Sequence, residues 1–251
     1  GVVGGCDEAG GAVQISVMAL KGTDYRASGD AQIEGLETGL NITTDLHLGA
    51  ADLARFSGLA GRPIGGAVTA KIKGSAAPLS GTFDVDLTLR ADELRAGIEQ
   101  VDPLIAGATT LKLKAARDTQ GLRIDHFDLS NPALSAQAQG KLDSTTGALT
   151  LAARLNDINP LVPQTSGPLE FSADVTRDGD TLSGKAQLKG PNESVAMLDG
   201  SIDRSGNTAL TFDATLKDLQ RFLPELAGQL AAQGKASRQA GIWDIDTSSV
   251  R

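Results

Sequence analysis

Residues that carry most enzyme chemistry are scarce in this chain of 251 residues. Its one cysteine, Cys6, can form neither an internal disulfide nor a zinc site with several thiolates. Its two histidines, His47 and His126, lie in strand-like segments, and we interpret them as solvated strand residues. No nucleophile elbow and no glycine loop followed by Lys-Ser or Lys-Thr is present. The sequence therefore predicts a protein that is not an enzyme, with no catalytic residue, no metal site and no cofactor.

Aromatic residues and positive charge are also scarce. Aromatics make up 3% of the chain, so a core must be built from Leu, Val, Ile and Ala, which favours many thin and similar layers. The net charge of −8 argues against nucleic acid and against anionic lipid surfaces as partners. No apolar run approaches the ~20 residues of a membrane span. Because the chain starts at Gly1 without methionine and stops at Arg251 within an alternating pattern, we expect an internal fragment.

What the chain does contain is a repeat. Residues 140–158 and 200–219 share one pattern of glycine, an aspartate, a turn, an alternating segment and a second aspartate, and residues 29–53 and 81–94 are similar. New segments restart at glycines about 40 to 60 residues apart, which is typical of arrays. The sequence predicts one continuous β-repeat array over 1–251, with approximate units 1–64, 65–106, 107–166, 167–227 and 228–251.

Within each unit, apolar residues alternate with polar ones. This period of two predicts antiparallel strands with one apolar and one wet face, although a slip of one residue would exchange the faces. The residues predicted for the apolar face are Phe83, Val85, Leu87, Leu89, Leu111, Leu113, Leu149, Leu151, Leu155, Phe171, Leu210, Phe212 and Leu216.

Turn and helix signals separate the alternating segments. Hairpin turns are predicted at 119–121, 144–147, 178–180 and 205–207. Short crossover helices are predicted near 50–60, 92–102, 157–162 and 218–226, with Asp52, Asp157 and Asp218 at helix N-caps. The predicted fold class is all-β, with meanders of about four strands joined by these helices.

A family resemblance is carried by the segments between the strands. The sequence LNDI at 155–158 precedes Pro160, LKDL at 216–219 precedes Pro224, and new strands open at Gly107 and Gly167. This repeat pattern resembles that of the TamB branch of the AsmA-like envelope proteins, over essentially the whole chain. The resemblance rests on repeat pattern and on an Ala-, Gly- and Asp-rich composition.

The resemblance implies an antiparallel sheet rolled into an elongated, taco-like groove in the Gram-negative periplasm, in a parent chain anchored in the inner membrane. It implies that the groove shields and conducts phospholipid acyl chains between the two membranes, with the predicted apolar residues as its lining. It also implies a TamA-like outer-membrane barrel as a possible partner.

Three other functions remain open on the pattern alone. The chain could be a scaffold for the assembly of outer-membrane proteins and autotransporters, using strand addition. The apolar faces could instead pack against each other in a closed β-solenoid, as in an adhesin or a spacer. A carbohydrate-active β-helix would need paired acids in register, and none is found in the sequence.

Overall fold

The structure is a computed structural model and describes residues 2–7, 12–35, 39–163, 165–218, 220 and 228–250. It divides into two compact units, Gly1–Ala133 and Leu134–Arg251, which we describe separately as unit 1 and unit 2.

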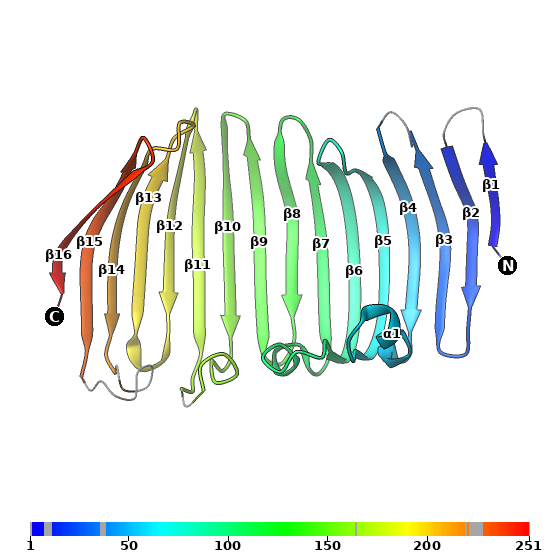
Figure 1. Cartoon of the computed structure of the whole chain (residues 1–251), viewed down its shortest axis with the longest axis horizontal. Helices are drawn as coiled ribbons and strands as arrows, with labels where there is room; N and C mark the ends of the chain where they lie inside the picture. The colour runs from blue at the N-terminus through cyan, green and yellow to red at the C-terminus, as the bar shows by residue number, and fades with distance from the viewer. Residues whose placement is uncertain are drawn as a thin grey trace. The chain divides into compact units, whose positions relative to one another are not determined.

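Unit 1 is an antiparallel meander in which each strand pairs with the next one along the chain (Figure 1). Its strands are β1 (Val2–Asp7), β2 (Ala12–Lys21), β3 (Tyr25–Glu34), β4 (Asn41–Ala50), β5 (Gly65–Ala77), β6 (Thr82–Arg95), β7 (Thr109–Arg117) and β8 (Gly121–Ser130).

Unit 2 repeats this arrangement, again with sequential antiparallel pairing. Its strands are β9 (Leu134–Asp143), β10 (Thr146–Leu155), β11 (Leu169–Asp178), β12 (Thr181–Lys189), β13 (Val195–Ile202), β14 (Thr208–Leu216), β15 (Leu230–Gln239) and β16 (Ile242–Val250). One 3₁₀ turn, η2 (Pro191–Glu193), lies between β12 and β13.

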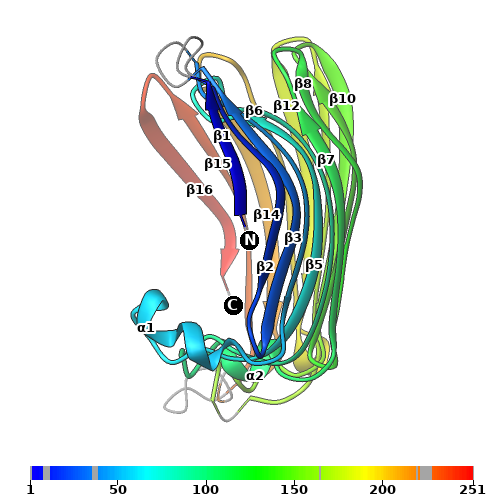
Figure 2. The ribbon, with the colours of Figure 1, turned by 90° about the vertical axis from the view of Figure 1, so that its right-hand side faces the viewer.

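The prediction of an all-β fold built on an open antiparallel sheet is confirmed. Within each unit the described strands form a single sheet whose strand order follows the chain, and the sheet does not close on itself. Strands β5 to β8 bend along their length, as Figure 2 shows. These strands therefore do not build a closed sandwich or solenoid core, because the described part of each unit contains no second sheet.

The first predicted helical connection is present. A 3₁₀ helix, η1 (Leu53–Phe56), continues into α1 (Ser57–Ala60) between β4 and β5. The predicted N-cap is confirmed, since the Asp52 carboxylate accepts a hydrogen bond of 2.8 Å from the backbone N–H of Ala54. Because β4 and β5 are antiparallel neighbours, this segment is a long hairpin connection and not a crossover.

The other predicted helices differ from the structure. β6 continues to Arg95, so the helix expected at 92–102 is displaced to α2 (Asp102–Ile105), and only β5 and β6 lie between the first two helical connections. The segment 157–162 forms turns, and Asp157 accepts hydrogen bonds from the backbone N–H groups of Asn159 and Gly167 instead of capping a helix. The segment that would follow an Asp218 cap lies largely outside the described residues.

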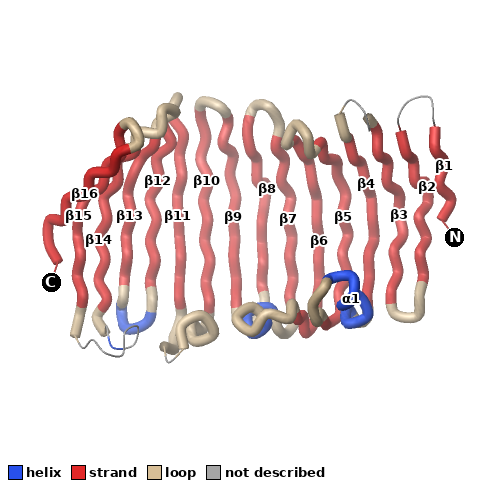
Figure 3. The backbone as a smooth tube through the Cα atoms, viewed as in Figure 1, coloured by secondary structure: helices blue, strands red, loops and turns tan. Residues whose placement is uncertain are grey.

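The tight turns follow their sequence signals. All four predicted turn segments lie where one strand ends and the next begins, and loops join these neighbouring strands in Figure 3. Between β13 and β14, the Asp203 carboxylate accepts hydrogen bonds from the backbone N–H and the side-chain amide of Asn207, at 2.9 and 2.8 Å. The side-chain amide of Asn207, more than any other group, holds the pKa of Asp203 below its ordinary value.

Candidate functional site: the apolar faces of the two sheets

Strand register brings the predicted apolar residues of unit 1 onto one face. Residues directly opposed in an antiparallel pair point to the same face of the sheet. Leu87 on β6 opposes Ile72 on β5 and Leu113 on β7, and two residues along, Leu89 opposes Leu111. The members of the predicted set that share this face are Phe83, Val85, Leu87, Leu89, Leu111 and Leu113.

The same reasoning places the remaining predicted residues on one face of unit 2. Leu151 opposes Ala173, and this row continues through Ala186 and Leu198 to Phe212. Neighbouring rows on this face contain the rest of the predicted set, which is Leu149, Leu155, Phe171, Leu210 and Leu216. Leu155 is only 6% exposed, so it does not contribute to an accessible surface.

Several residues on these faces were missed by the sequence pattern. They share register with the predicted set, and they are Ile42, Leu46, Leu48, Ile72, Leu188, Leu198, Trp243 and Ile245. Apolar and polar residues alternate around Leu46 and Leu48, so this period of two could have placed both leucines on the apolar face from the sequence alone.

The apolar face of unit 2 is exposed to an unusual degree for large side chains. Leu151 is 37% exposed, Phe171 is 39% exposed and Leu198 is 46% exposed. These residues lie along strand interiors and not at turns. No second layer from the described residues of unit 2 covers them, so this face is an accessible apolar surface.

Small residues lie between the large side chains of this surface and make it uneven. A Cβ built on Gly234 would lie 2.6 Å from Cζ of Phe212, so the phenyl ring lies across the Gly234 backbone. Gly234 opposes Phe212 directly on the neighbouring strand, and Ala173 and Ala186 follow Leu151 in the same row. Large side chains are thus separated by shallow gaps of the kind that a flexible apolar chain fills.

One end of the apolar face of unit 1 is covered by the first helical connection. The Phe56 ring packs edge-on against Tyr25, with centroids 5.8 Å apart. The Arg55 guanidinium lies 5.3 Å from the Tyr25 ring centroid and 3.3 Å from the Asp24 carboxylate. Tyr25 shares its row with Ala50 on the apolar face. Because α1 lies on the inner side of the bend in Figure 2, we infer that this apolar face is the concave one.

The opposite faces are polar, and the two histidines lie there. Both are exposed, as predicted, and Nε2 of His47 lies 3.9 Å from the Asp45 carboxylate. Across the placed part of the chain, no group of three or more His, Cys, Asp or Glu residues is arranged to hold a metal ion. Among the helices that the structure describes, none has the length and hydropathy needed to cross a membrane.

Comparison of the chain with protein-family models, curated proteins and solved structures found no match.

Proposed function

We propose that this chain is a periplasmic groove segment that shields and conducts phospholipid acyl chains between the inner and outer membranes. The observation that carries the proposal is the apolar face of unit 2, where Leu151, Phe171 and Leu198 are each more than one-third exposed on strand interiors. An exposed apolar surface of this kind normally marks a binding site.

The physical chemistry of the face fits acyl chains better than a ligand with polar groups. Removing apolar surface from water contributes roughly 25 cal/mol per Å², so an acyl chain on this face is stabilised in proportion to its length. Leu, Phe and Ala side chains make no hydrogen bonds, so an acyl chain can slide along the rows without losing specific contacts. The charged opposite face keeps the sheet hydrated.

The resemblance to the TamB branch of AsmA-like proteins also supports this proposal. On this proposal the parent chain is anchored in the inner membrane, and a TamA-like outer-membrane barrel is a further partner.

A scaffold for outer-membrane protein assembly is the second candidate function. The feature that favours it is the apolar surface of β16, where Ile242, Trp243 and Ile245 are exposed by 75%, 53% and 64%. Strand addition would bind extended peptides from barrel proteins through this backbone. A proline within β16 would abolish peptide binding and leave a lipid load on the apolar face intact.

The first experiment is lipid extraction and mass spectrometry on the chain purified from a bacterial periplasm without detergent. We expect a stoichiometric load of phospholipid. Phe171→Asp should remove most of it, because it places a carboxylate on the apolar face. Ser172→Asp is the matched control, because Ser172 is exposed on the opposite face of the same strand.

A second matched pair repeats the comparison on β10. Leu151→Asp should lose lipid, whereas Ala152→Asp, on the opposite face, should keep it. Circular dichroism should show the same strand content for all four variants. A lipid-free, monodisperse and folded wild-type chain would contradict the conduit function.

A further inference from the structure

We propose that the polar face of unit 1 contains an anion site for a phosphate-type group, formed by Arg26, His47, Lys71 and Arg90. A depression of about 560 Å³ is lined by these four residues together with Ser28, Leu48, Thr69, Ala70 and Thr88. Its lining contains two arginines, one lysine, one histidine and three hydroxyl groups, and it contains no carboxylate. The site lies on the polar face of unit 1, whereas the proposed function is carried by the apolar face of unit 2, so the site does not rest on the proposed function.

Register places the cationic groups in two adjacent rows. In the first row Arg26 opposes Gly49, Gly49 opposes Thr69, and Thr69 opposes Arg90. Adjacent strands lie about 4.8 Å apart, and three such spacings separate Arg26 from Arg90, so their backbones are about 14 Å apart. Thr69 lies between them in the row. The second row contains His47 and Lys71, directly opposed on β4 and β5.

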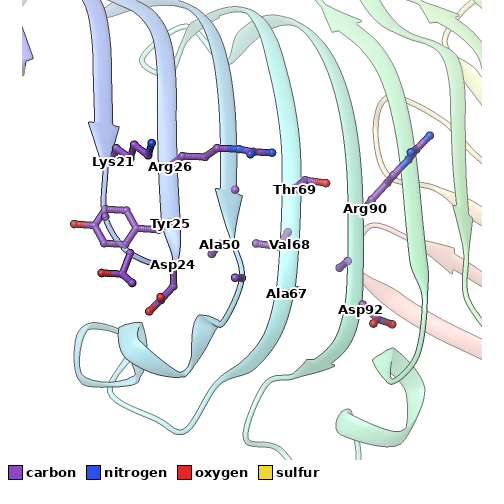
Figure 4. A pocket seen from close by; sticks show the side chains of 15 residues that line it. Lys21, Asp24, Tyr25, Arg26, Ala50, Ala67, Val68, Thr69, Arg90 and Asp92 are labelled. Carbon is purple, nitrogen blue, oxygen red and sulfur yellow. The ribbon is translucent and has the colours of Figure 1, made fainter.

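Gly49 lets Arg26 reach into this depression. A Cβ built on Gly49 would lie 3.1 Å from Nε of Arg26, so the arginine side chain lies across the glycine. Figure 4 shows the Arg26 side chain crossing β4 toward Thr69. Any larger residue at position 49 would displace this side chain, although the strand itself would accept it.

The cations of this site are not neutralised. Among the residues that the structure places, Arg26, Lys71 and Arg90 form no ion pair, and of the four residues only His47 approaches a carboxylate, that of Asp45, at 3.9 Å. Acids on this face lie one row further along on both sides, at Asp92 beyond Arg90 and at Asp45 with its row neighbours Asp30 and Asp86. A local depression lined by the unpaired cations Arg26, Lys71 and Arg90 attracts anions even in a chain whose net charge is −8.

The residue types indicate a phosphate-type ligand. Guanidinium groups bind phosphate oxygens through paired N–H donors, and hydroxyl and ammonium groups complete such sites. The phosphate could be free in solution or part of a lipid headgroup at a membrane surface, and these two sources share the same chemistry.

The test titrates the full chain with inorganic phosphate and follows the backbone amides of Thr69 and Lys71 by NMR, with chloride at matched ionic strength as the reference. In parallel, flotation measures binding to phosphatidylcholine vesicles with and without phosphatidic acid. We expect saturable shifts or phosphatidic-acid-dependent flotation that weaken with added salt. The arm that responds identifies the source of the phosphate.

Three variants separate a built site from general charge attraction. Arg26→Ala with Arg90→Ala should weaken binding about tenfold or more. Lys185→Ala with Lys235→Ala removes the same charge from the polar face of unit 2 and should leave binding unchanged. Gly49→Val keeps every charge, displaces Arg26, and should weaken binding severalfold.

Two outcomes would overturn the proposal. One is an absence of specific binding in both the phosphate and the vesicle arms. The other is an equal loss of binding in the unit 1 and unit 2 double variants, which would show attraction to net charge only.

Discussion

Units 1 and 2 use the same alternating pattern, but their apolar faces are filled differently. In unit 1 one row across the strands reads Leu46, Ile72, Leu87, Leu113 and Phe127, and all five side chains are half-buried. In unit 2 the row through Leu151 alternates large residues with alanine and glycine, and its leucines remain more than one-third exposed. The same binary pattern therefore gives a self-covering surface where large residues are contiguous and an open one where they are spaced.

The polar faces of the two units differ in how their basic residues are paired across the strands. In unit 2 Lys185 lies between Asp174 and Asp199, with 3.4 Å between its Nζ and the Asp199 carboxylate, and Lys235 opposes Asp246. In unit 1 the arginines of the proposed anion site oppose glycine and threonine. Cross-strand pairing of opposite charges stabilises a sheet by up to ~1 kcal/mol per pair. Unit 1 makes such a pair between Lys73 and Asp45, at 3.2 Å, but the two arginines of the proposed site forgo this stabilisation.

The largest expected effect is on the free energy of unfolding, and it compares one Leu→Asp substitution on each of the two apolar faces. Leu87→Asp in unit 1 should lower the free energy of unfolding by about 3 kcal/mol, because it places a charge within a contiguous apolar row. Leu151→Asp in unit 2 should cost only about 1 kcal/mol, because that side chain is already 37% exposed. Urea unfolding measures both values. Thr88→Asp, which lies between Lys71 and Lys112, is the near-neutral control. Equal costs for the two leucine variants would refute the contrast between the units.

A smaller effect on the free energy of unfolding tests the role of the small residues on the apolar face of unit 2. Gly234→Ala should lower the free energy of unfolding by about 2 kcal/mol, because its Cβ would lie 2.6 Å from both the Phe212 ring and the backbone oxygen of Asp246. Gly184→Ala on the same face should change it by less than about 0.5 kcal/mol, because the nearest atom to its Cβ is 3.5 Å away. Thermal unfolding of both variants checks this, and a neutral Gly234→Ala would show that Phe212 does not lie over the glycine.

The smallest effect concerns pH and the turn between β13 and β14. Because the pKa of Asp203 is lowered in the folded state, its contribution to stability is present above the ordinary carboxyl range and is lost as pH falls through the lowered pKa. Asn207→Ala should move the Asp203 midpoint upward toward the ordinary value, as measured by carboxyl ¹³C NMR. Gln120→Ala, in the β7–β8 turn of unit 1, should leave that midpoint unchanged. An unmoved midpoint in Asn207→Ala would rule out this hydrogen bond as the cause.

The success of the strand prediction has a local physical basis. Residues such as Phe83, Val85 and Leu87 alternate with Asp84 and Asp86, and a period of two fixes both the element type and the face. Short-range signals at turns and at Asp52 were equally readable, because each depends on hydrogen bonds within a few residues.

The errors came from interactions between segments that are distant in sequence. The helix predicted at 92–102 was displaced because β6 keeps pairing with β5 as far as Arg95. Asp157 resembled a helix cap, but its second hydrogen bond goes to Gly167, ten residues away. The cationic depression was not visible in the sequence, where Lys71 follows Arg26 by 45 positions, Arg90 follows Lys71 by 19, and the net charge is negative.

The sequence by itself determined that the chain forms antiparallel strands, where most of them turn, and which residues share an apolar face within each strand, because these properties depend on local backbone geometry and side-chain alternation. Only the tertiary structure decided which residues of neighbouring strands form a row, because register is set by pairing across the sheet. That register determines how far large apolar residues are spaced in unit 2. It also brings the arginines of unit 1 to either side of Thr69.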